Sequence, residues 1–475
     1  MPRYKNLTQV QEDLASGLIT CEHLVEYYLD RIRATKHLNI YIEVFEEEVL
    51  QKAKMLDEKY KNDPNSVGRL YGMVLSIKDV LCYKDHKVTA GSKILEGFTS
   101  LFTATAIDRL LAEDAIIIGR VNCDQFAMGS SNENSHYGPT KNGLNPNKVP
   151  GGSSGASAVS VQIDTCLIAL GTDTGGSVRQ PAAFCGILGF KPSYGRVSRY
   201  GLLAYGSSFD QIGVLANSVE DIAITLELMA GLDEFDSTSS THKVPPYATK
   251  LVSTEKVKIA YFPSAIHHES IHPDVREQML DFIHQLKSDG HAAEGVGFDY
   301  LDYIIPAYYV LSTAEASSNL SRYDGIRYGY RSPNATNLEE TYTLSRTEGF
   351  STEVKRRIML GTFVLSAGYY DAYYGKAQKV RRLIAQKTAK IFEEYDFIIM
   401  PTAPSPAWDL GAVNDDPVAM YLADIFTVQA NMVGIPAISI PLGTSDGLPI
   451  GVQLMANKFE ESKLLSFVKQ LGSQE

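Results

Sequence analysis

The chain has 475 residues, of which 44% are hydrophobic, and a net charge of −12. This length allows a large core, whereas the acidic balance argues against a protein that binds nucleic acid mainly through its own surface. The five scattered cysteines form no CxxC pair, no apolar run approaches about 18 residues, and no signal-peptide core opens the chain. We therefore expect a cytoplasmic protein without disulfide bonds, a zinc site or a membrane span.

The first half of the chain alternates between helical and strand patterns. Thr8 and Thr20 are expected to cap two opening helices. Further elements are predicted in this order: a charged helix over 46–60, a strand over 71–80, a helix over 103–112, a strand over 115–120, a small-residue helix over 156–161, a strand over 166–170, and a helix from a capping box at Ser218 to near Gly231.

The second half continues with strands and longer helices. The predicted elements are a strand over 256–262, an amphipathic helix over 273–288, a mostly continuous helix over 353–395, strands over 396–400, 435–442 and 448–455, and a closing helix. We therefore predict an α/β fold with one large mixed, largely parallel sheet, flanked by helices on both faces. The whole chain, 1–475, is expected to be one domain, with a helical N-terminal segment over about 1–65 and an insertion that carries the substrate pocket over about 232–395.

One serine motif points to a mechanism that the rest of the chain does not support. Residues 151–155, GGSSG, match the G-x-S-x-G nucleophile elbow of α/β-hydrolases. That elbow follows a strand directly, whereas 142–150 has the composition of a polar loop. It also requires a late histidine, and the last histidine is His291. A Ser-His-Asp triad is therefore not expected.

Lysine is the next candidate for a general base. Lys78 is the only lysine inside an apolar, strand-like run, VLSIKDV. A lysine removed from water can be neutral near pH 7 and can then accept a proton. An ion pair with Asp79 or with another acid explains the same position. The spacing alone leaves both interpretations open.

Three motifs together resemble the amidase signature family over essentially the whole chain. They are Ile77-Lys78-Asp79, GGSSGAS at 151–157 and GTDTGGSVRQP at 171–181. Ala156 replaces a glycine of the family motif and adds only a methyl group. The resemblance implies the amidase signature fold and a Ser–Ser–Lys triad. In that triad Ser177 is the nucleophile that becomes acylated, and Ser153, at a cis peptide bond, passes the proton to Lys78.

The second glycine turn is expected to stabilise negative charge. The backbone N–H groups of Thr174, Gly175, Gly176 and Ser177 are suited to hold the developing oxyanion, and such donors are worth about 3–4 kcal/mol each in a transition state. An ordinary turn is the alternative for the two glycines. We expect the neighbouring acid and arginine of the motif to brace the turn; they are Asp173 and Arg179.

Several segments resemble one branch of this family, the glutaminase subunits of tRNA-dependent amidotransferases. They lie at 126–135, 236–240, 315–332 and 353–381. This resemblance implies that glutamine is deamidated and that the ammonia passes to a partner, which converts Glu-tRNA(Gln) to Gln-tRNA(Gln) using ATP. The implied partners are the B and C subunits of such a complex. This chain is expected to bind no cofactor, and ATP and Mg²⁺ are expected on the partner, because no P-loop is present.

Free glutamine carries an α-carboxylate and an α-ammonium group, so its pocket needs one cation and one anion. By the same resemblance, Arg357 receives the carboxylate, for which a planar guanidinium is suited, and Asp424 receives the ammonium group. Tyr308 or Tyr309 and Ser130 are expected in the pocket wall. Without the resemblance, the arginine would be read as a solvated helix residue and the aspartate as a surface acid.

Two other functions remain open. The first is a stand-alone amidase for a small or aryl amide, with the triad but without the Arg357/Asp424 pair. The second is a catalytically silent scaffold subunit, against which the intact triad argues. His267, His268 and His272 surround a predicted helix start and are expected to form an exposed cap, so no metal site is predicted.

Overall fold

Short apolar runs along the chain form one sheet. The computed structural model describes residues 3–252, 255–412 and 417–472. Within them an 11-stranded sheet has the order β1-β3-β2-β4-β6-β5-β10-β11-β9-β7-β8. The strands are β1 (Tyr41–Val44), β2 (Val74–Lys78), β3 (Ile116–Val121), β4 (Ile168–Thr172), β5 (Leu188–Lys191), β6 (Ile212–Ala216), β7 (Lys258–Tyr261), β8 (Ala292–Gly295), β9 (Phe397–Pro401), β10 (Ala437–Ser445) and β11 (Leu448–Ala456).

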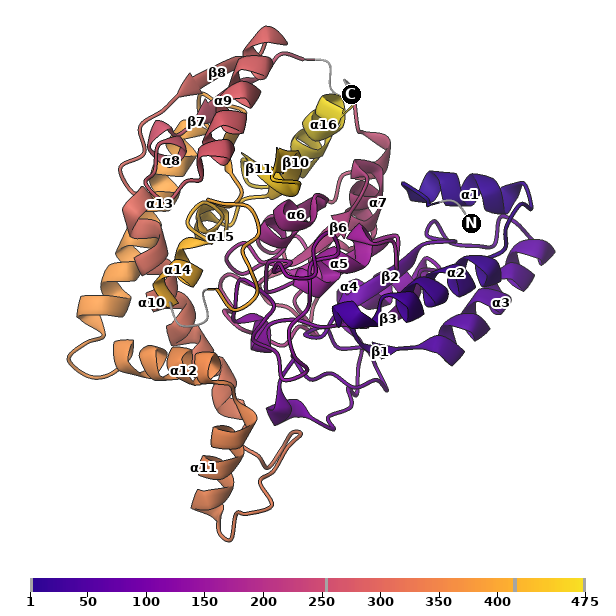
Figure 1. Cartoon of the computed structure of the whole chain (residues 1–475), viewed down its shortest axis with the longest axis horizontal. Coiled ribbons are helices and arrows are strands. Elements are labelled where there is room, and N and C mark those ends of the chain that lie inside the picture. Colours follow the sequence, from indigo (N-terminus) through magenta and orange to yellow (C-terminus); the bar gives the residue numbers. More distant parts are fainter. Residues whose placement is uncertain (1–2, 253–254, 413–416, 473–475) are drawn as a thin grey trace.

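Helices surround this sheet (Figure 1). They are α1 (Leu7–Ala15), α2 (Cys21–Ala34), α3 (Glu46–Asn62), α4 (Thr105–Ala112), α5 (Gly155–Gln162), α6 (Arg179–Cys185), α7 (Val219–Met229), α8 (Pro263–Ile266), α9 (Pro273–Ser288), α10 (Leu301–Asn319), α11 (Leu338–Gly349), α12 (Thr352–Val364), α13 (Lys376–Ile391), α14 (Pro417–Leu422), α15 (Val428–Val433) and α16 (Glu461–Gly472). Every residue of β2, β4, β6 and β9 is buried. Both faces of the sheet are therefore covered, as predicted.

The sheet is mixed, as predicted, but it is not largely parallel. Strands β3, β2 and β4 pair in parallel, and so do β9, β7 and β8. Between these two groups, β4, β6, β5, β10, β11 and β9 pair antiparallel. The prediction was wrong here because β5 and β6 are short strands that the sequence pattern did not reveal. The β10–β11 hairpin turns at Asp446 and Gly447, which both have positive φ, as its two-residue turn requires.

The predicted helix starts are mostly correct. Thr20 accepts a hydrogen bond from the His23 N–H and caps α2, and Ser218 does the same for α7. The Thr8 prediction was wrong, because Asn6 caps α1 and Thr8 already lies inside the helix. The predicted helix over 353–395 is interrupted: α12 ends at Val364, and a π-helix over Asp371–Gly375 precedes α13.

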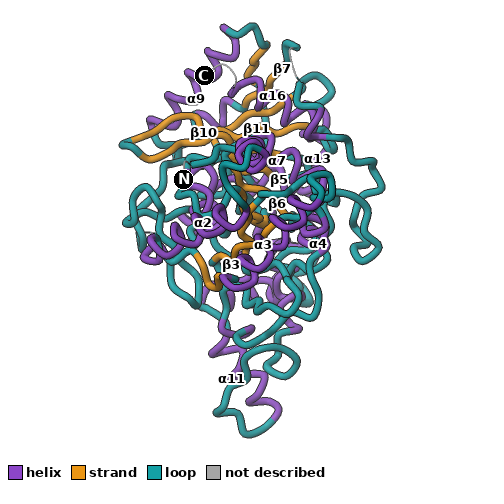
Figure 2. Tube along the Cα trace, turned by 90° about the vertical axis from the view of Figure 1, so that its right-hand side faces the viewer, coloured by secondary structure: helices purple, strands orange, loops and turns teal. Residues whose placement is uncertain are grey.

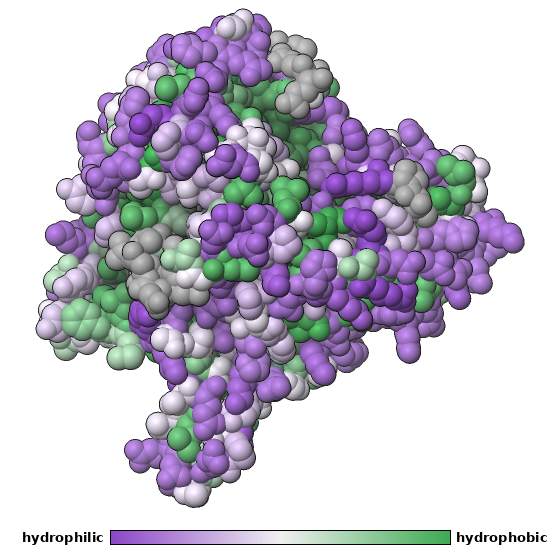
Figure 3. All heavy atoms as spheres, in the orientation of Figure 1, coloured by the Kyte–Doolittle hydropathy of each residue, from purple (hydrophilic) through white to green (hydrophobic). Residues whose placement is uncertain are grey.

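The outer parts of the molecule are mainly helical and polar. Helices α1 to α3 gather at one end, and α11 projects from the body in both views (Figures 1 and 2). The face shown in Figure 3 is mostly hydrophilic, with apolar side chains in separate patches. None of the helices in the described residues is long and apolar enough to cross a membrane. One sheet joins strands from Tyr41 to Ala456, whereas our division into N-terminal segment and insertion stays a prediction.

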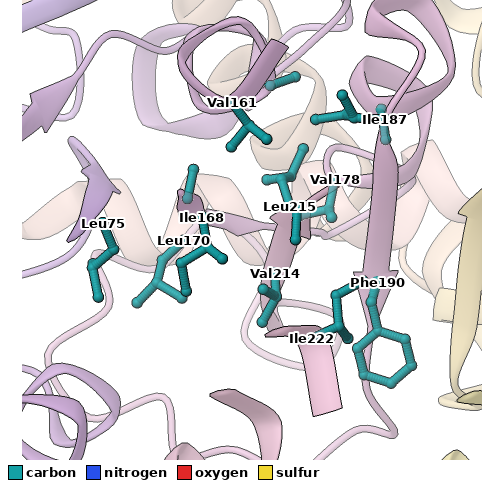
Figure 4. Close-up of a cluster of buried hydrophobic side chains, with 14 of the residues drawn as sticks. Leu75, Val161, Ile168, Leu170, Val178, Ile187, Phe190, Val214, Leu215 and Ile222 are labelled. Carbon is teal, nitrogen blue, oxygen red and sulfur yellow. The ribbon is translucent and has the colours of Figure 1, made fainter. Parts of the chain in front are cut away.

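A cluster of buried hydrophobic side chains supports the strands that lead to the glycine turns. Leu170 on β4, Leu215 on β6 and Phe190 on β5 belong to it, together with Val161 of α5 (Figure 4). The small residues of α5 let that helix lie close to β4, as the sequence predicted. All residues of α5 are buried, so its N-terminal turn is held by packing on every side.

Removal of one side chain from this cluster tests the assignment of the core. Leu215 is fully buried, whereas Leu232 is 57% exposed. We expect Leu215→Ala to lower the free energy of unfolding by about 2–5 kcal/mol, because it removes buried methyl groups and leaves a cavity. The matched control, Leu232→Ala, should change it by no more than about 0.5 kcal/mol. Urea unfolding followed by circular dichroism measures the free energy of unfolding of both variants. Equal losses of free energy would contradict the assignment of Leu215 to the core.

Candidate active site

The predicted triad lies where two neighbouring strands end. Lys78 is the last residue of β2, and Ser177 lies in the turn that follows β4. Because β2 and β4 are parallel, their carboxyl ends share one edge of the sheet. Ser153 lies in the turn before α5. The Lys78 Nζ donates hydrogen bonds to Ser153 Oγ at 2.7 Å and to Ser154 Oγ at 2.9 Å. A third bond, of 3.0 Å, reaches Thr172 Oγ1.

Burial changes the acid–base behaviour of Lys78. The side chain is completely buried. Loss of hydration lowers the pKa of Lys78 from 10.5 to about 8, although Cys123, Asp124 and Asp173 act in the opposite direction. A fraction of the amine is therefore neutral near pH 7, as a general base requires.

The ion pair with Asp79 that the sequence left open is not present. The Asp79 carboxylate accepts hydrogen bonds from the Thr89 N–H at 3.0 Å and from the Gly91 N–H at 2.9 Å. Its nearby cation is Arg120, whose Nη1 lies 3.6 Å from the Asp79 Oδ1. Lys78 is therefore surrounded by hydroxyl groups, not by a carboxylate.

The two serines differ in their access to solvent. The Gly152–Ser153 peptide bond is cis, as the resemblance implied, and Ser153 is completely buried behind Lys78. Ser177 is 8% exposed. Its hydroxyl makes none of the hydrogen bonds found among the described residues, while its carbonyl accepts one from the Ser154 N–H at 3.1 Å. Of the three side chains, Ser177 is thus the one placed to meet a substrate.

The turn from Thr174 to Ser177 has fewer available N–H groups than expected. The Gly176 N–H donates to Asp173 Oδ1 at 2.9 Å, which commits this donor to the protein. The expectation that Gly176 helps to hold an oxyanion is therefore corrected. The N–H groups of Thr174, Gly175 and Ser177 make none of the hydrogen bonds found among the described residues. These three donors remain as candidates.

Asp173 and Arg179 hold the turn from inside. Two nitrogens of Arg179, Nε and Nη2, bind the Asp173 carboxylate at 3.0 and 2.9 Å, and both side chains are fully buried. Burial alone would raise the pKa of Asp173, but the Arg179 charge lowers it from 3.8 to about 2. The same carboxylate accepts the Val178 N–H at 3.2 Å. The pair therefore braces the turn.

A second group of predicted residues surrounds a buried arginine. Arg357, on α12, is only 3% exposed, so it is not a solvated helix residue. Its Nε donates to Glu353 Oε1 at 2.7 Å and its Nη1 to the Tyr205 hydroxyl at 2.8 Å. The rings of Tyr309 and Tyr421 lie 5.3 and 5.6 Å from the guanidinium carbon. The Nη2 makes none of the hydrogen bonds among the described residues.

The predicted acid is buried as well. Asp424 is 8% exposed, so it is not a surface acid, and its Oδ2 accepts a hydrogen bond from Ser130 Oγ at 2.8 Å. Burial raises the pKa of Asp424 from 3.8 to about 7, although Ser130 and Arg357 lower it. Among the described residues no cation forms an ion pair with this carboxylate within 4.0 Å.

Contacts connect both charged residues to the nucleophile turn. The Thr427 hydroxyl donates to the Gly175 carbonyl at 2.7 Å and to the Asp424 carbonyl at 3.1 Å. On the other side, the Tyr308 ring packs edge-on against Tyr309, the ring next to the arginine. A Cβ on Gly175 would lie 2.6 Å from the Tyr308 hydroxyl, so glycine is needed there. Tyr308 thus faces the turn, and Tyr309 faces Arg357.

The sequence did not single out several residues that build the site. They are Ser154, Thr172, Gln180, Tyr205, Glu353 and Tyr421. Only Glu353 carried a usable signal, because it precedes Arg357 by one helical turn and can form an i,i+4 pair. Ser154, Thr172 and Gln180 lie inside the quoted motifs, but their contacts depend on partners in other segments. Tyr205 and Tyr421 approach from segments outside the motifs.

His267 and His268 follow α8, and His272 directly precedes α9. His272 caps the helix by accepting the Asp274 N–H at 3.3 Å. Within the described ranges, no group of three or more His, Cys, Asp or Glu side chains is arranged to hold a metal ion.

The buried pair of Asp173 and Arg179 predicts how stability changes when one partner is removed. We expect Asp173→Asn to lower the free energy of unfolding by about 3–5 kcal/mol at pH 7, because it leaves the Arg179 charge buried without its anion. The control is Asp30→Asn, which breaks an exposed pair with Arg33 and should cost less than about 1 kcal/mol. Because the pKa of Asp173 is lowered to about 2, its contribution is present above pH 4 and is lost as the pH falls toward 2. Urea unfolding at several pH values measures both effects, and similar losses in the two variants would contradict this role.

Comparison with known proteins agrees with this geometry. The amidase family model matches residues 23–465. The A subunit of glutamyl-tRNA(Gln) amidotransferase from Chlorobium luteolum is 51% identical over 472 residues, which cover 99% of this chain and 97% of that protein. The A subunit of the same enzyme from Chlorobaculum tepidum is 50% identical over 472 residues, 99% of this chain and 98% of the relative.

Solved structures show the same architecture. The crystal structure of the glutamyl-tRNA(Gln) amidotransferase A subunit from Thermotoga maritima has a TM-score of 0.78 and 37% identity, and the match covers 94% of this chain and 90% of that chain. A peptide amidase in complex with the inhibitor chymostatin has a TM-score of 0.82 and 26% identity, over 97% and 95% of the two chains. Since the family match and these relatives extend over nearly its whole length, the chain belongs to the amidase family.

Proposed function

We propose that this chain is the glutaminase subunit of a tRNA-dependent amidotransferase and that it releases ammonia from glutamine for a partner subunit. One observation carries the proposal: a buried cation, Arg357, and a buried acid without a cation, Asp424, are both connected to the turn that bears Ser177. A free amino acid has the two opposite charges that such a pocket requires. The names of the relatives support the same function.

In the proposed reaction, the neutral amine of Lys78 takes the proton of Ser153 while Ser153 takes that of Ser177. The Ser177 Oγ attacks the side-chain amide carbon of glutamine, and the oxygen that becomes negative is held by the N–H groups of Thr174, Gly175 and Ser177. Return of the proton to the amide nitrogen releases ammonia and leaves a glutamyl ester on Ser177. Water then attacks the ester by the same relay, which frees glutamate and the serine.

The substrate charges are assigned to the second group of residues. The unused Nη2 of Arg357 is directed to the α-carboxylate, while Glu353 and Tyr205 hold the rest of the guanidinium. Asp424 receives the α-ammonium group, which favours the ionised carboxylate and replaces the absent cation. Ser130, whose hydroxyl binds the Asp424 carboxylate, belongs to this end of the pocket.

The remaining steps belong to other proteins. We propose that ammonia passes to the B subunit of a complex that also contains a C subunit, and that Glu-tRNA(Gln), ATP and Mg²⁺ bind mainly to these partners. A chain with a net charge of −12 is poorly suited to grip tRNA alone. We also propose that the complex works in the cytoplasm, in keeping with the tRNA-dependent relatives.

A stand-alone amidase remains the second candidate. The similarity to a peptide amidase favours it at the level of the fold. An amide without the two α-charges, however, would leave Asp424 buried without a cation, which is costly. We therefore rank the glutaminase first.

The nucleophile assignment can be tested in the complex. We expect Ser177→Ala to abolish ammonia release from glutamine, because no acyl-enzyme can form, and to abolish glutamine-dependent amidation of Glu-tRNA(Gln). The same variant should still amidate Glu-tRNA(Gln) when ammonium chloride is supplied, because transfer takes place on the partner. Ammonia release and amidation are measured together with glutamine or with ammonium chloride.

Two results would contradict these assignments. Undiminished ammonia release by the Ser177→Ala complex would exclude Ser177 as the nucleophile. A wild-type chain that hydrolyses simple amides but ignores glutamine would support the stand-alone amidase instead.

The pH dependence tests Lys78 and Asp424 together. The base must be neutral, and burial lowers the pKa of Lys78 to about 8; the ammonium site must be ionised, and burial raises the pKa of Asp424 to about 7. The value of kcat/KM for glutamine should therefore fall about tenfold per pH unit below 8, and more steeply below 7, where both groups are protonated. In Asp424→Asn, which has a lower kcat/KM, the steeper part should be missing. If kcat/KM of Asp424→Asn still falls more steeply below pH 7, Asp424 is not the second group whose protonation lowers activity.

A further inference from the structure

Gln180 connects three segments of the site, two through its side chain and one through its backbone N–H. It lies in the first turn of α6, three residues after Ser177, and is completely buried. Its Oε1 accepts the Gly152 N–H at 2.9 Å, and its Nε2 donates to the Ser130 carbonyl at 2.9 Å. Its own backbone N–H donates to the Gly176 carbonyl at 2.9 Å. One glutamine therefore bridges the turn of the relay serine, the loop of the ammonium end and the turn of the nucleophile.

The side-chain bonds of Gln180 reach residues that adjoin or belong to the proposed site. Gly152 directly precedes Ser153, so a shift of its N–H moves the relay hydroxyl. Ser130 binds the Asp424 carboxylate through its own hydroxyl at 2.8 Å. A Cβ on Gly151 would lie 2.4 Å from the Gln180 Oε1, so the glycine turn is in close contact with the amide. Movement of the amide would thus be transmitted to both ends of the site.

The chemistry of the position explains why glutamine occupies it. The amide offers one acceptor to an N–H group and one donor to a carbonyl, in a fixed geometry. A methionine of similar length offers neither bond. An ionised glutamate keeps the acceptor but faces the Ser130 carbonyl without a proton to donate. A protonated glutamate restores both bonds, because its carbonyl accepts and its hydroxyl donates.

We infer that Gln180 is a positioning residue that couples the relay serine, Ser153, to the ammonium end of the pocket at Ser130 and Asp424. The inference rests on the proposed glutaminase function and adds to it. Because Gln180 touches neither substrate nor the reacting atoms, it acts through Gly152 and the Ser130 carbonyl. Its loss should change both kcat and KM for glutamine.

Other bonds hold the same segments, so the fold does not depend on Gln180 alone. The Asn132 side chain accepts the Ala156 N–H at 2.8 Å, and Asp124 accepts the Asn132 N–H at 2.9 Å. These bonds join the loop after Ser130 to the start of α5. Substitution of Gln180 is therefore expected to shift the turns without unfolding them.

The chain contains a matched control. Gln162, at the end of α5, is also buried and also bridges a glycine N–H and a backbone carbonyl. Its Oε1 accepts the Gly143 N–H at 2.9 Å, and its Nε2 donates to the Cys185 carbonyl at 3.0 Å. Besides this pair of bonds it donates to the Asn142 Oδ1 at 3.3 Å. None of its side-chain hydrogen bonds among the described residues reaches the three turns of the site.

The experiment compares Gln180→Met, Gln180→Glu, Gln162→Met and Gln162→Glu in the full complex. Initial rates of ammonia release give kcat and KM for glutamine between pH 6 and 9. We expect Gln180→Met to lower kcat and raise KM, with kcat/KM at least tenfold below wild type at every pH. At pH 9 the kcat/KM of Gln180→Glu should be as low as that of Gln180→Met. Between pH 9 and pH 6, the ratio of its kcat/KM to that of wild type should rise at least tenfold. Burial and the nearby Asp124 carboxylate favour its protonated form. Both Gln162 variants should stay within about twofold of wild type.

A second measurement does not depend on glutamine. The rate at which a sulfonyl fluoride labels Ser177 reports on the reactivity of the serine without the glutamine-binding residues, and it should fall in Gln180→Met but not in Gln162→Met. Equal effects at positions 180 and 162, or a kcat/KM ratio of Gln180→Glu to wild type that does not change with pH, would overturn the inference. A wild-type complex that is labelled at Ser177 but releases no ammonia from glutamine would instead overturn the proposed function. In that case, the labelling rates of the Gln180 and Gln162 variants would still decide whether Gln180 positions the relay.

Discussion

The site depends on one constraint: Lys78 is buried at the end of a central strand, and no acid among the described residues forms an ion pair with it. Burial of an unpaired charge is costly, and the cost is reduced when the amine loses its proton. The three hydroxyl groups around Lys78 satisfy its nitrogen in either state, because a hydroxyl both donates and accepts. A buried carboxylate in their place would have kept the lysine charged. These three hydroxyl groups therefore allow the Lys78 amine to be neutral, as the proposed general base requires.

The acids near Lys78 are each occupied elsewhere. Asp79 binds two backbone N–H groups beside Arg120, and Asp173 is paired with Arg179. Asp124 accepts the N–H groups of Asn132 and Asn134. Asp173 holds the turn that carries Ser177, and Asp124 holds the loop after Ser130. Asp79 holds the neighbouring segment from Thr89 to Gly91. The same hydrogen bonds thus shape the site and leave its lysine without an ion pair.

Sequence patterns predicted the parts of the molecule whose signals are local. The strand that ends in Lys78, the small-residue helix α5 and the cap at Ser218 follow from composition and spacing within a few residues. The short strands β5 and β6 were not predicted, although β6 is an apolar run, and the sheet was therefore predicted as too parallel. Motif resemblance predicted the residues of the triad, but not the use of the Gly176 N–H by Asp173, because that bond depends on how the turn closes around the carboxylate. Gln180 and Tyr205 were missed because their partners lie in distant segments.

The two ends of the proposed pocket are prepared differently, and this difference bears on specificity. Arg357 already has an anion, Glu353, and three tyrosine rings, so its charge is stable before any substrate arrives. The Asp424 carboxylate accepts a hydrogen bond from a hydroxyl group but forms no ion pair within 4.0 Å among the described residues, and burial raises its pKa to about 7. A substrate with an α-ammonium group supplies the missing charge, whereas an amide without it leaves a buried carboxylate unpaired. Sites that hold unpaired polar groups reject analogues that lack the matching partner far more strongly than apolar pockets do. Selection among amides would therefore depend on Asp424, which gains its cation only from the substrate. It would depend less on the triad, because every amide substrate reacts with the same triad.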